Sequence, residues 1–168
     1  MKDFLNFLIK RSISYLQEDL NIEVIDSVFE IICPKKMKMK KNTVMIGLGG
    51  NINSLISIGS DDLLLDKILE SFLEGAPIDN KDIADIRDSL SCEIANIIIG
   101  NAISPFANDS IINITPPILI YEESSFFKYK DSKITSVTIK TKFGEMLVVV
   151  TMPKIDKFSK QLKWQSLS

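Results

Sequence analysis

Histidine is absent from this chain of 168 residues. Its absence excludes catalysis by a histidine acid or base, serine–histidine and cysteine–histidine nucleophile pairs, and metal sites with histidine ligands. Cysteine is almost as scarce, because the sequence holds only Cys33 and Cys92, whose spacing does not fit a metal site. We expect both to be reduced, buried side chains that pack as small hydrophobic groups. Cys92 precedes Glu93, but no residue in the sequence marks a base that would make it a nucleophile.

Long apolar runs are also missing. No continuous apolar segment near the start of the chain is long enough for a signal peptide or a membrane span, so we expect a cytoplasmic protein without a membrane segment. The net charge is only −2, and the charge balance gives no indication of nucleic-acid binding. We interpret a local lysine cluster as a solvated loop and strand edge that discourages edge-to-edge pairing. It comprises Lys35, Lys36, Lys38, Lys40 and Lys41.

The hydrophobic content of 45% is enough for one sizeable core in a chain of this length. We place one domain at residues 1–153 and interpret residues 154–168 as a basic tail that either docks or frays. Periodicity and turn residues give the order helix, strand, hairpin, two helices, kinked strand and hairpin. The corresponding ranges are 2–20, 22–33, 42–58, 61–74, 79–101, 111–121 and 134–152. This order predicts an α/β (α+β) domain in which a mainly antiparallel β-sheet packs against two long helices plus an N-terminal helix.

Turn and cap residues mark the ends of these elements. The expected hairpin turns are Gly49-Gly50-Asn51 and Lys142-Phe143-Gly144, since glycine and asparagine tolerate positive φ. Pro116-Pro117 predicts a kink at a sheet edge, because two consecutive residues lack an amide donor. Ser60 is expected to cap the helix that follows it, and Asp79 with Asp82 is a carboxylate variant of the capping box.

The segment Asp79–Asn101 is the one around which the chain is organised. Apolar residues recur in it at spacings of three and four, which is typical of a helix with one buried face. The predicted core stripe consists of Ile83, Ile86, Leu90, Ile94 and Ile97.

A second series in the same segment is polar or small: Ser89, Glu93, Asn96 and Gly100. At about 100° per residue, the first three lie within roughly 60° of one another, beside the buried stripe. Asparagine is a poor helix former, and glycine weakens a helix by roughly 1 kcal/mol relative to alanine. Local stability alone would therefore not select these residues. The alternative interpretation is an ordinary solvated helix face.

The pattern Ser89-x3-Glu93-x2-Asn96, followed downstream by Ile114-Thr115-Pro116-Pro117, resembles the active-site signature of the CheC/CheX family of bacterial chemotaxis phosphatases. A single signature, the opening helix and the Gly49-Gly50 hairpin before a helix are similar to the CheX branch. The resemblance covers about residues 2–153 and implies the CheC/CheX-like single-domain fold.

The resemblance also implies an activity, hydrolysis of the aspartyl phosphate on a CheY-like response regulator in chemotaxis signalling. In that role Asn96 would position the attacking water in line, Glu93 would dock the regulator by pairing with the lysine at its phosphorylation site, and Ser89 is a possible accessory residue. No cofactor and no metal ligand are expected in this chain, because the regulator would contribute a divalent metal ion, Mg²⁺. Relatives of this branch form homodimers, so a homodimer is implied, although the sequence does not identify the strand that would form it.

The preceding helix repeats the spacing as Asp66-x3-Glu70-x2-Leu73, but leucine stands where the amide would be. Leucine cannot orient water, so we expect one active site, with Asp66 and Glu70 as solvated acids and Leu73 in the core. Two alternatives stay open: a non-catalytic adaptor that binds a receiver domain or a flagellar-switch protein, and a purely structural dimerising domain. The amide at position 96 favours the enzyme, because an adaptor does not need it.

Overall fold

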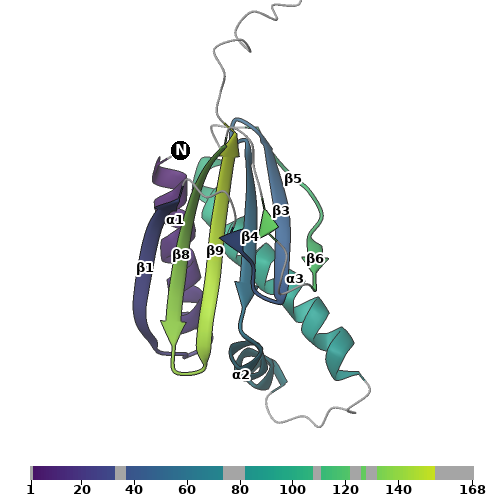
Figure 1. Cartoon of the computed structure of the whole chain (residues 1–168). Helices are drawn as coiled ribbons and strands as arrows, with labels where there is room; N and C mark the ends of the chain where they lie inside the picture. Colours follow the sequence, from purple (N-terminus) through teal and green to yellow (C-terminus); the bar gives the residue numbers. More distant parts are fainter. Residues whose placement is uncertain are drawn as a thin grey trace, which may run out of the picture.

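The computed structural model describes residues 2–32, 37–73, 82–107, 111–121, 126–127 and 132–153. It shows one antiparallel sheet with helices against one face (Figure 1). Cys33, Lys35, Lys36, Asp79 and the basic tail lie outside these residues.

The main sheet has the strand order β1-β8-β9-β4-β3-β5, and β6 also pairs with β3. Every pairing is antiparallel. The strands are β1 (Val24–Ile32), β3 (Asn42–Gly50), β4 (Ser54–Ser60), β5 (Ile112–Ile114), β6 (Ile118–Ile120), β8 (Ser132–Thr141) and β9 (Gly144–Pro153). Two short strands, β2 (Met37–Lys38) and β7 (Phe126–Phe127), form a separate two-stranded sheet. The predicted antiparallel α+β architecture is confirmed.

Both predicted hairpins are present as β3–β4 and β8–β9, and each turn requires its glycine. Gly50 has a φ of +91°, and a Cβ there would lie 2.2 Å from the backbone oxygen of Ile111. Gly144 has a φ of +123°, and a Cβ there would lie 2.9 Å from the Cβ of Asp61. Any other residue would be strained in backbone and in space at these two positions.

The predicted kinked strand is confirmed as β5 and β6, which run along β3 on either side of the proline pair. Between them the Thr115 amide donates to the Gly47 carbonyl at 3.0 Å, and the Gly47 amide donates to Thr115 Oγ1 at 2.9 Å. Pro116 and Pro117 thus lie at the sheet edge, where their missing amide hydrogens disrupt no ladder.

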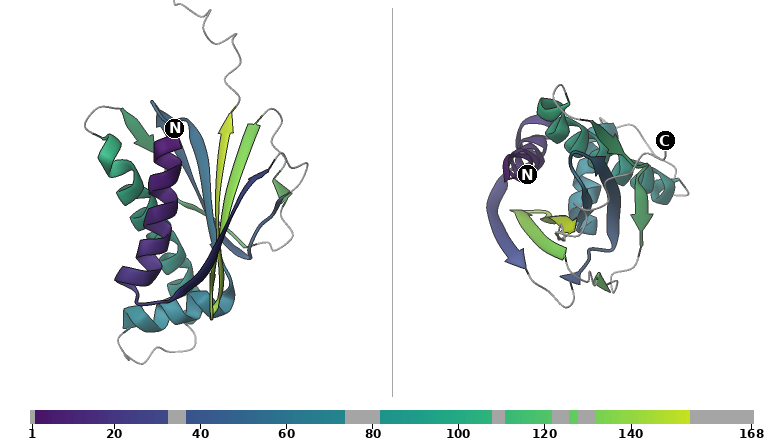
Figure 2. Two further views of the ribbon diagram at one scale, coloured as in Figure 1. Left: turned by 90° about the vertical axis from the view of Figure 1, so that its left-hand side faces the viewer. Right: turned by 90° about the horizontal axis from the view of Figure 1, so that it is seen from above.

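Two helices cover one face of the sheet, and a third lies across its end (Figure 2). α1 (Lys2–Ser14) continues as a π-helical turn, Tyr15–Asp19, so the predicted opening helix is nearly correct in extent. α3 (Ile83–Ile103) packs beside α1 and ends in a 3₁₀ turn, Ser104–Phe106. α2 (Asp62–Leu73) is the helix at the end of the sheet. Within the described residues, no helix is long and apolar enough to cross a membrane.

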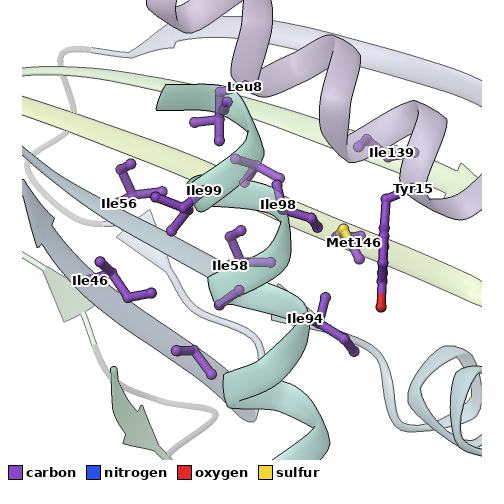
Figure 3. Packing of buried hydrophobic residues seen from close by; sticks show 14 of the residues in the cluster. Leu8, Tyr15, Ile46, Ile56, Ile58, Ile94, Ile98, Ile99, Ile139 and Met146 are labelled. Carbon is purple, nitrogen blue, oxygen red and sulfur yellow. The ribbon is translucent and has the colours of Figure 1, made fainter. Parts of the chain in front are cut away.

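The buried face of α3 differs from the predicted stripe. Leu90 and Ile94 are buried as expected, but Ile86 and Ile97 are only partly buried and Ile83 is not among the core residues. The core side chains of the second half of α3 are instead Ala95, Ile98, Ile99, Ala102 and Ile103. The physical reason is that α3 contacts both the sheet and α1, so its buried arc is wider than one stripe and rotated from it (Figure 3).

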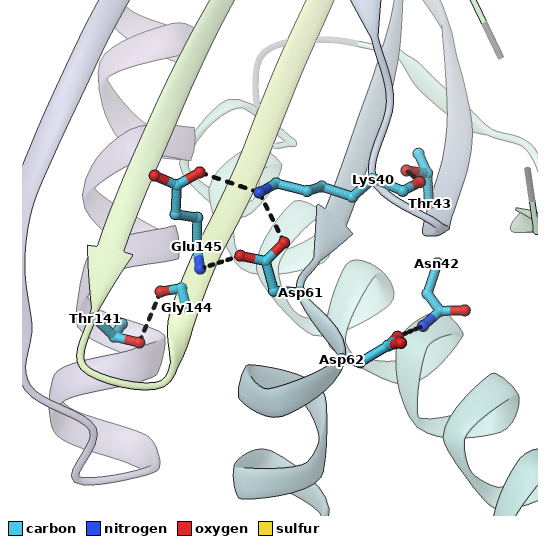
Figure 4. A network of polar contacts seen from close by, with 8 residues as sticks. All are labelled: Lys40, Asn42, Thr43, Asp61, Asp62, Thr141, Gly144 and Glu145. Atoms are coloured by element: carbon cyan, nitrogen blue, oxygen red, sulfur yellow. Dashed lines mark hydrogen bonds and ion pairs between the residues drawn. The ribbon is translucent and has the colours of Figure 1, made fainter. Parts of the chain in front are cut away.

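A lysine-centred network joins the start of α2 to the β8–β9 hairpin (Figure 4). Lys40 Nζ donates to Asp61 Oδ1 at 2.7 Å and to Glu145 Oε2 at 3.0 Å, and the Glu145 amide donates to Asp61 Oδ2 at 2.9 Å. Burial acts to lower the pKa of Lys40, but its hydrogen bonds to the two carboxylates outweigh burial and raise the pKa above its ordinary value. Lys40 is therefore a structural ion-pair residue, and its interpretation as a solvated edge lysine is wrong.

The start of α2 is also one residue later than expected. Ser60 is buried at the end of β4, and the Leu65 amide donates to the Asp61 carbonyl at 3.0 Å. Asp61, rather than the predicted Ser60, is the residue that accepts the first hydrogen bond of this helix.

Candidate functional site

The solvent-facing side of α3 carries the candidate residues. Ser89, Glu93 and Asn96 are all exposed, whereas their neighbours Leu90 and Ile94 are 7% and 3% exposed. The buried neighbours fix the rotation of the helix, so the three polar side chains project together from its outer face. The structure thus brings together the residues that the sequence spacing placed on one face.

Glu93 and Asn96 form no side-chain hydrogen bond or ion pair with any other residue that the structure describes. Neighbouring carboxylates are engaged instead: Asp66 on α2 pairs with Arg87 on α3, and Glu70 pairs with Lys67 at 2.9 Å. Within the described residues, the acid and the amide of the candidate site therefore make no internal polar contact, and their polar groups face outward.

An open groove of about 370 Å³ lies between α2 and α3, next to the candidate residues. Its lining is Leu69, Phe72, Leu73, Ile86, Ser89, Leu90 and Glu93. The groove is therefore apolar along its walls and carries a hydroxyl and a carboxylate at one side. Asn96 does not line it.

Phe72 separates this groove from a second hollow of about 370 Å³. The second hollow is lined by Tyr15, Asp19, Leu20, Ser71, Phe72 and Ile97. Phe72 is 46% exposed, which leaves much of an aromatic ring in water at the end of α2. Sequence analysis missed this residue, because one apolar side chain at a helix end carries no signal of its own.

Tyr15 connects the end of α1 to the site electrostatically. Its side chain is 2% exposed, and burial, followed by the charges of Asp19 and Glu93, raises the pKa of Tyr15 to about 12. The Glu93 carboxylate therefore lies within electrostatic reach of a buried phenol, although the Tyr15 hydroxyl has no hydrogen-bond partner among the residues that the structure describes.

Cys92 packs against the core as a small hydrophobic group, as predicted, but it is only partly buried. Burial, followed by the charge of Asp88, raises the pKa of the Cys92 thiol. A thiol held protonated at neutral pH is a poor nucleophile, which agrees with the interpretation that Cys92 has no catalytic part.

The repeated spacing on α2 lies in a different environment from the spacing on α3. Asp66 is not simply solvated as predicted, since it pairs with Arg87 across the helix interface. Glu70 is exposed, as predicted, and Leu73 packs partly buried against the core. Leu73 stands in the amide position and has no polar group to hold a water, so this face lacks the amide of the signature.

The segment after the proline pair lies beside α3. The Tyr121 hydroxyl, directly after β6, donates to the Asp88 carboxylate one residue before Ser89. The downstream prolines of the sequence signature thus lie between the edge strands β5 and β6, and β6 is next to the helix that carries the signature. In the described part of the chain, no group of three or more histidine, cysteine or acidic side chains is arranged to hold a metal ion.

Comparisons with known proteins agree with this architecture. The family model described as "Chemotaxis phosphatase CheX" matches residues 42–142, more than half of the chain. A search of curated proteins gave no match.

Solved structures of low sequence identity share the fold. The chemotaxis protein CheX of Desulfovibrio desulfuricans is 17% identical, with a TM-score of 0.73 over 88% of this chain and 97% of that one. The CheX of a CheX–CheY–BeF3–Mg²⁺ complex from Borrelia burgdorferi is 22% identical, with a TM-score of 0.70 over 88% and 96%. FliY of Thermotoga maritima is more distant, 15% identical with a TM-score of 0.54 over 87% and 85%. On the family match and the shared fold, this chain belongs to the chemotaxis phosphatase CheX family.

Proposed function

We propose that this protein hydrolyses the aspartyl phosphate of a CheY-like response regulator, with Asn96 positioning the attacking water. The observation that carries the proposal is the exposed amide of Asn96 beside the exposed carboxylate of Glu93 on one face of α3, in a chain of the CheX family. The Borrelia burgdorferi complex, in which a CheX is bound to CheY with BeF3 and Mg²⁺, supports a receiver domain as the partner.

The proposed reaction requires little covalent chemistry from the side chains of this protein. Water attacks the phosphorus, the bond between phosphorus and the aspartate oxygen breaks, and free aspartate and inorganic phosphate result. An acyl phosphate is already activated, so the main task is to hold the water in line with the breaking bond. The Asn96 carboxamide suits that task, because its oxygen accepts from water, its NH₂ donates to a phosphoryl oxygen, and its charge does not change with pH.

Glu93 has a different part in the proposal. A carboxylate one helical turn from Asn96 pairs with the lysine at the phosphorylation site of the receiver, which fixes the register of the two proteins. Ser89, one turn further, is an accessory contact. A Mg²⁺ ion held by the receiver would neutralise charge on the phosphoryl group there.

The test is a phosphate-release assay on several receiver domains phosphorylated from acetyl phosphate. Asn96→Ala is expected to lower the rate at saturating protein by about 100-fold or more while binding persists, because only the water-positioning group is lost. Glu93→Ala is expected to weaken both binding and turnover. Asn101→Ala is the matched control, since it removes an exposed amide from another side of the same helix and is expected to leave the rate unchanged.

Unchanged turnover in a folded Asn96→Ala variant would sink the proposal. Receiver binding without any acceleration by the wild-type protein would indicate the alternative, a non-catalytic adaptor for a receiver domain or a flagellar-switch protein.

We also propose that the protein is a homodimer that pairs through β1. Within the described residues, β1 lies at the edge of the sheet and is bonded on one side only, to β8. Three of its apolar side chains are strongly exposed: Ile25 at 65%, Phe29 at 49% and Ile31 at 60%. A long apolar edge strand invites pairing with another strand, and two copies of one strand pair antiparallel about a two-fold axis.

A further inference from the structure

Phe72, on the last turn of α2, is an exposed aromatic side chain that the packing of the described residues does not explain. The core contacts of this helix are made by other residues, Leu64, Leu65, Ile68 and Leu69, each no more than 7% exposed. Phe72 is 46% exposed and belongs to none of the core clusters of the described residues. A polar side chain would serve the isolated fold as well or better at such a position.

Phe72 lies next to the candidate site, which suggests a role in binding. The ring forms a wall of the α2–α3 groove, whose opposite side carries Ser89 and Glu93. It also forms a wall of the second hollow, which Ile97 shares with Tyr15. Ile97 follows Asn96 directly in α3, so Phe72 stands beside both the docking carboxylate and the helical turn that carries the amide.

The chemistry of the groove selects its occupant. Its walls are apolar at Leu69, Leu73 and Ile86, and one carboxylate, Glu93, stands at its side. Such a site fits an apolar side chain that lies next to a lysine on the partner, because the apolar group fills the groove while the ammonium reaches the carboxylate.

We propose that the α2–α3 groove receives an apolar side chain of the receiver domain, and that Phe72 is the anchor that determines affinity for it. This inference rests on the proposed function, since it takes the receiver as the partner and Glu93 as the pairing residue for its lysine. Phe72 acts in binding and Asn96 in turnover, so the two residues are separable by experiment.

The experiment measures binding and turnover separately. Binding is followed by fluorescence anisotropy of a labelled receiver carrying beryllofluoride and Mg²⁺, in an Asn96→Ala background with and without Phe72→Ala. The second substitution is expected to raise the dissociation constant about tenfold or more, as removal of an aromatic anchor does. Turnover is followed by phosphate release with Phe72→Ala alone, which is expected to raise KM by a similar factor and leave kcat within about twofold of wild type.

Two variants keep the test specific. Phe72→Leu retains an apolar wall and is expected to recover most of the affinity. Leu63→Ala truncates an apolar side chain on the same helix that is 72% exposed and lines neither hollow, and it is expected to change neither constant. Thermal unfolding of each variant checks that it is folded.

The outcomes separate this inference from the proposed function. If the wild-type protein accelerates phosphate release and Phe72→Ala has wild-type KM and affinity, the inference is wrong and the proposed function stands. If the protein does not accelerate release but Phe72→Ala still weakens receiver binding, the groove is a docking site on a non-catalytic protein. If Phe72→Ala changes the oligomeric mass and not receiver affinity, the groove is a contact between copies of this chain and the inference is overturned.

Discussion

At the scale of single residues, Tyr15 combines burial with an unsatisfied polar atom. In the described part of the chain its hydroxyl has no hydrogen-bond partner, and its side chain is 2% exposed. A buried hydroxyl without a partner costs about 1–3 kcal/mol of desolvation. We expect Tyr15→Phe, which keeps the ring, to raise the free energy of unfolding at pH 7 by about 1 kcal/mol in urea titrations. Tyr121→Phe is the contrasting variant, because it removes a hydroxyl that donates to Asp88 and is expected to bring no gain.

The raised pKa of Tyr15 predicts a dependence of stability on pH. The phenol loses its proton near pH 10 in the unfolded chain but only near pH 12 in the folded protein, so its contribution to stability is complete below pH 10 and declines above it. A difference of two pKa units corresponds to about 3 kcal/mol at most by pH 12. The advantage of Tyr15→Phe over wild type is therefore expected to widen as the pH rises from 10 to 12. If the free energy of unfolding of the two proteins changed with pH in the same way between pH 10 and 12, the raised pKa of a buried Tyr15 would be contradicted.

Residues differ in how much of their role a sequence can reveal. The exposed placement of Glu93 and Asn96 on one face of α3 was predictable from their spacing beside buried residues, whereas their roles stay a prediction. Phe72 and Tyr15 were not predictable, since an aromatic residue in an amphipathic helix is ordinary until the packing shows which part of it stays exposed or unpartnered. Lys40 was misassigned for a similar reason, because its two carboxylate partners lie 21 and 105 residues away in the chain.

At the scale of elements, Gly100 destabilises α3, and no steric constraint of the fold requires a glycine there. A Cβ built at Gly100 meets nothing within 4 Å, and the residue lies inside the helix. Alanine in place of glycine inside a helix stabilises the helix by about 1 kcal/mol. Gly100→Ala is therefore expected to raise the free energy of unfolding by about that amount, measured by urea denaturation.

Gly50→Ala provides the opposite control in the same assay. Its backbone has a φ of +91° and its Cβ would lie 2.2 Å from the Ile111 oxygen, so a clear loss of stability is expected. Equal effects of the two substitutions would refute the distinction between an unneeded glycine and a required one.

The elements themselves were largely predictable, and their buried faces were less so. Gly50 and Gly144 mark hairpin turns by local backbone chemistry, and Pro116-Pro117 marks a kink, so these boundaries follow from the sequence. The end of α3 is apolar on nearly every side from Ile94 to Ile103, which removes the periodic contrast that would orient it. Which of its side chains are buried therefore depends on the contacts of α3 with the sheet and with α1.

At the scale of the whole molecule, the order of the strands in the sheet could not be predicted from the sequence. β1 pairs with β8, so that Val24 faces Thr141 across more than a hundred residues of intervening chain. No local pattern specifies such a pairing, since alternating apolar residues fit next to any similar strand. The placement of β1 at the edge, and hence of its exposed apolar side chains, emerged only from the three-dimensional structure.

The exposed edge at β1 also predicts how the protein assembles. If β1 forms the dimer interface, Ile31→Lys places a charge among its exposed apolar groups and is expected to convert a dimer into a monomer in sedimentation analysis at micromolar concentration. Ile31 is already 60% exposed, so a folded monomer should survive the change. Ile118→Lys is the matched control, because Ile118 is 62% exposed on β6 beside the opposite edge of the sheet and should leave the dimer intact. Dissociation by Ile118→Lys and not by Ile31→Lys would move the interface to that other edge, where it would lie beside α3 and the candidate site.

Dimer formation and receiver docking would then compete for neighbouring surface, whereas pairing through β1 keeps the two functions on opposite sides of the molecule.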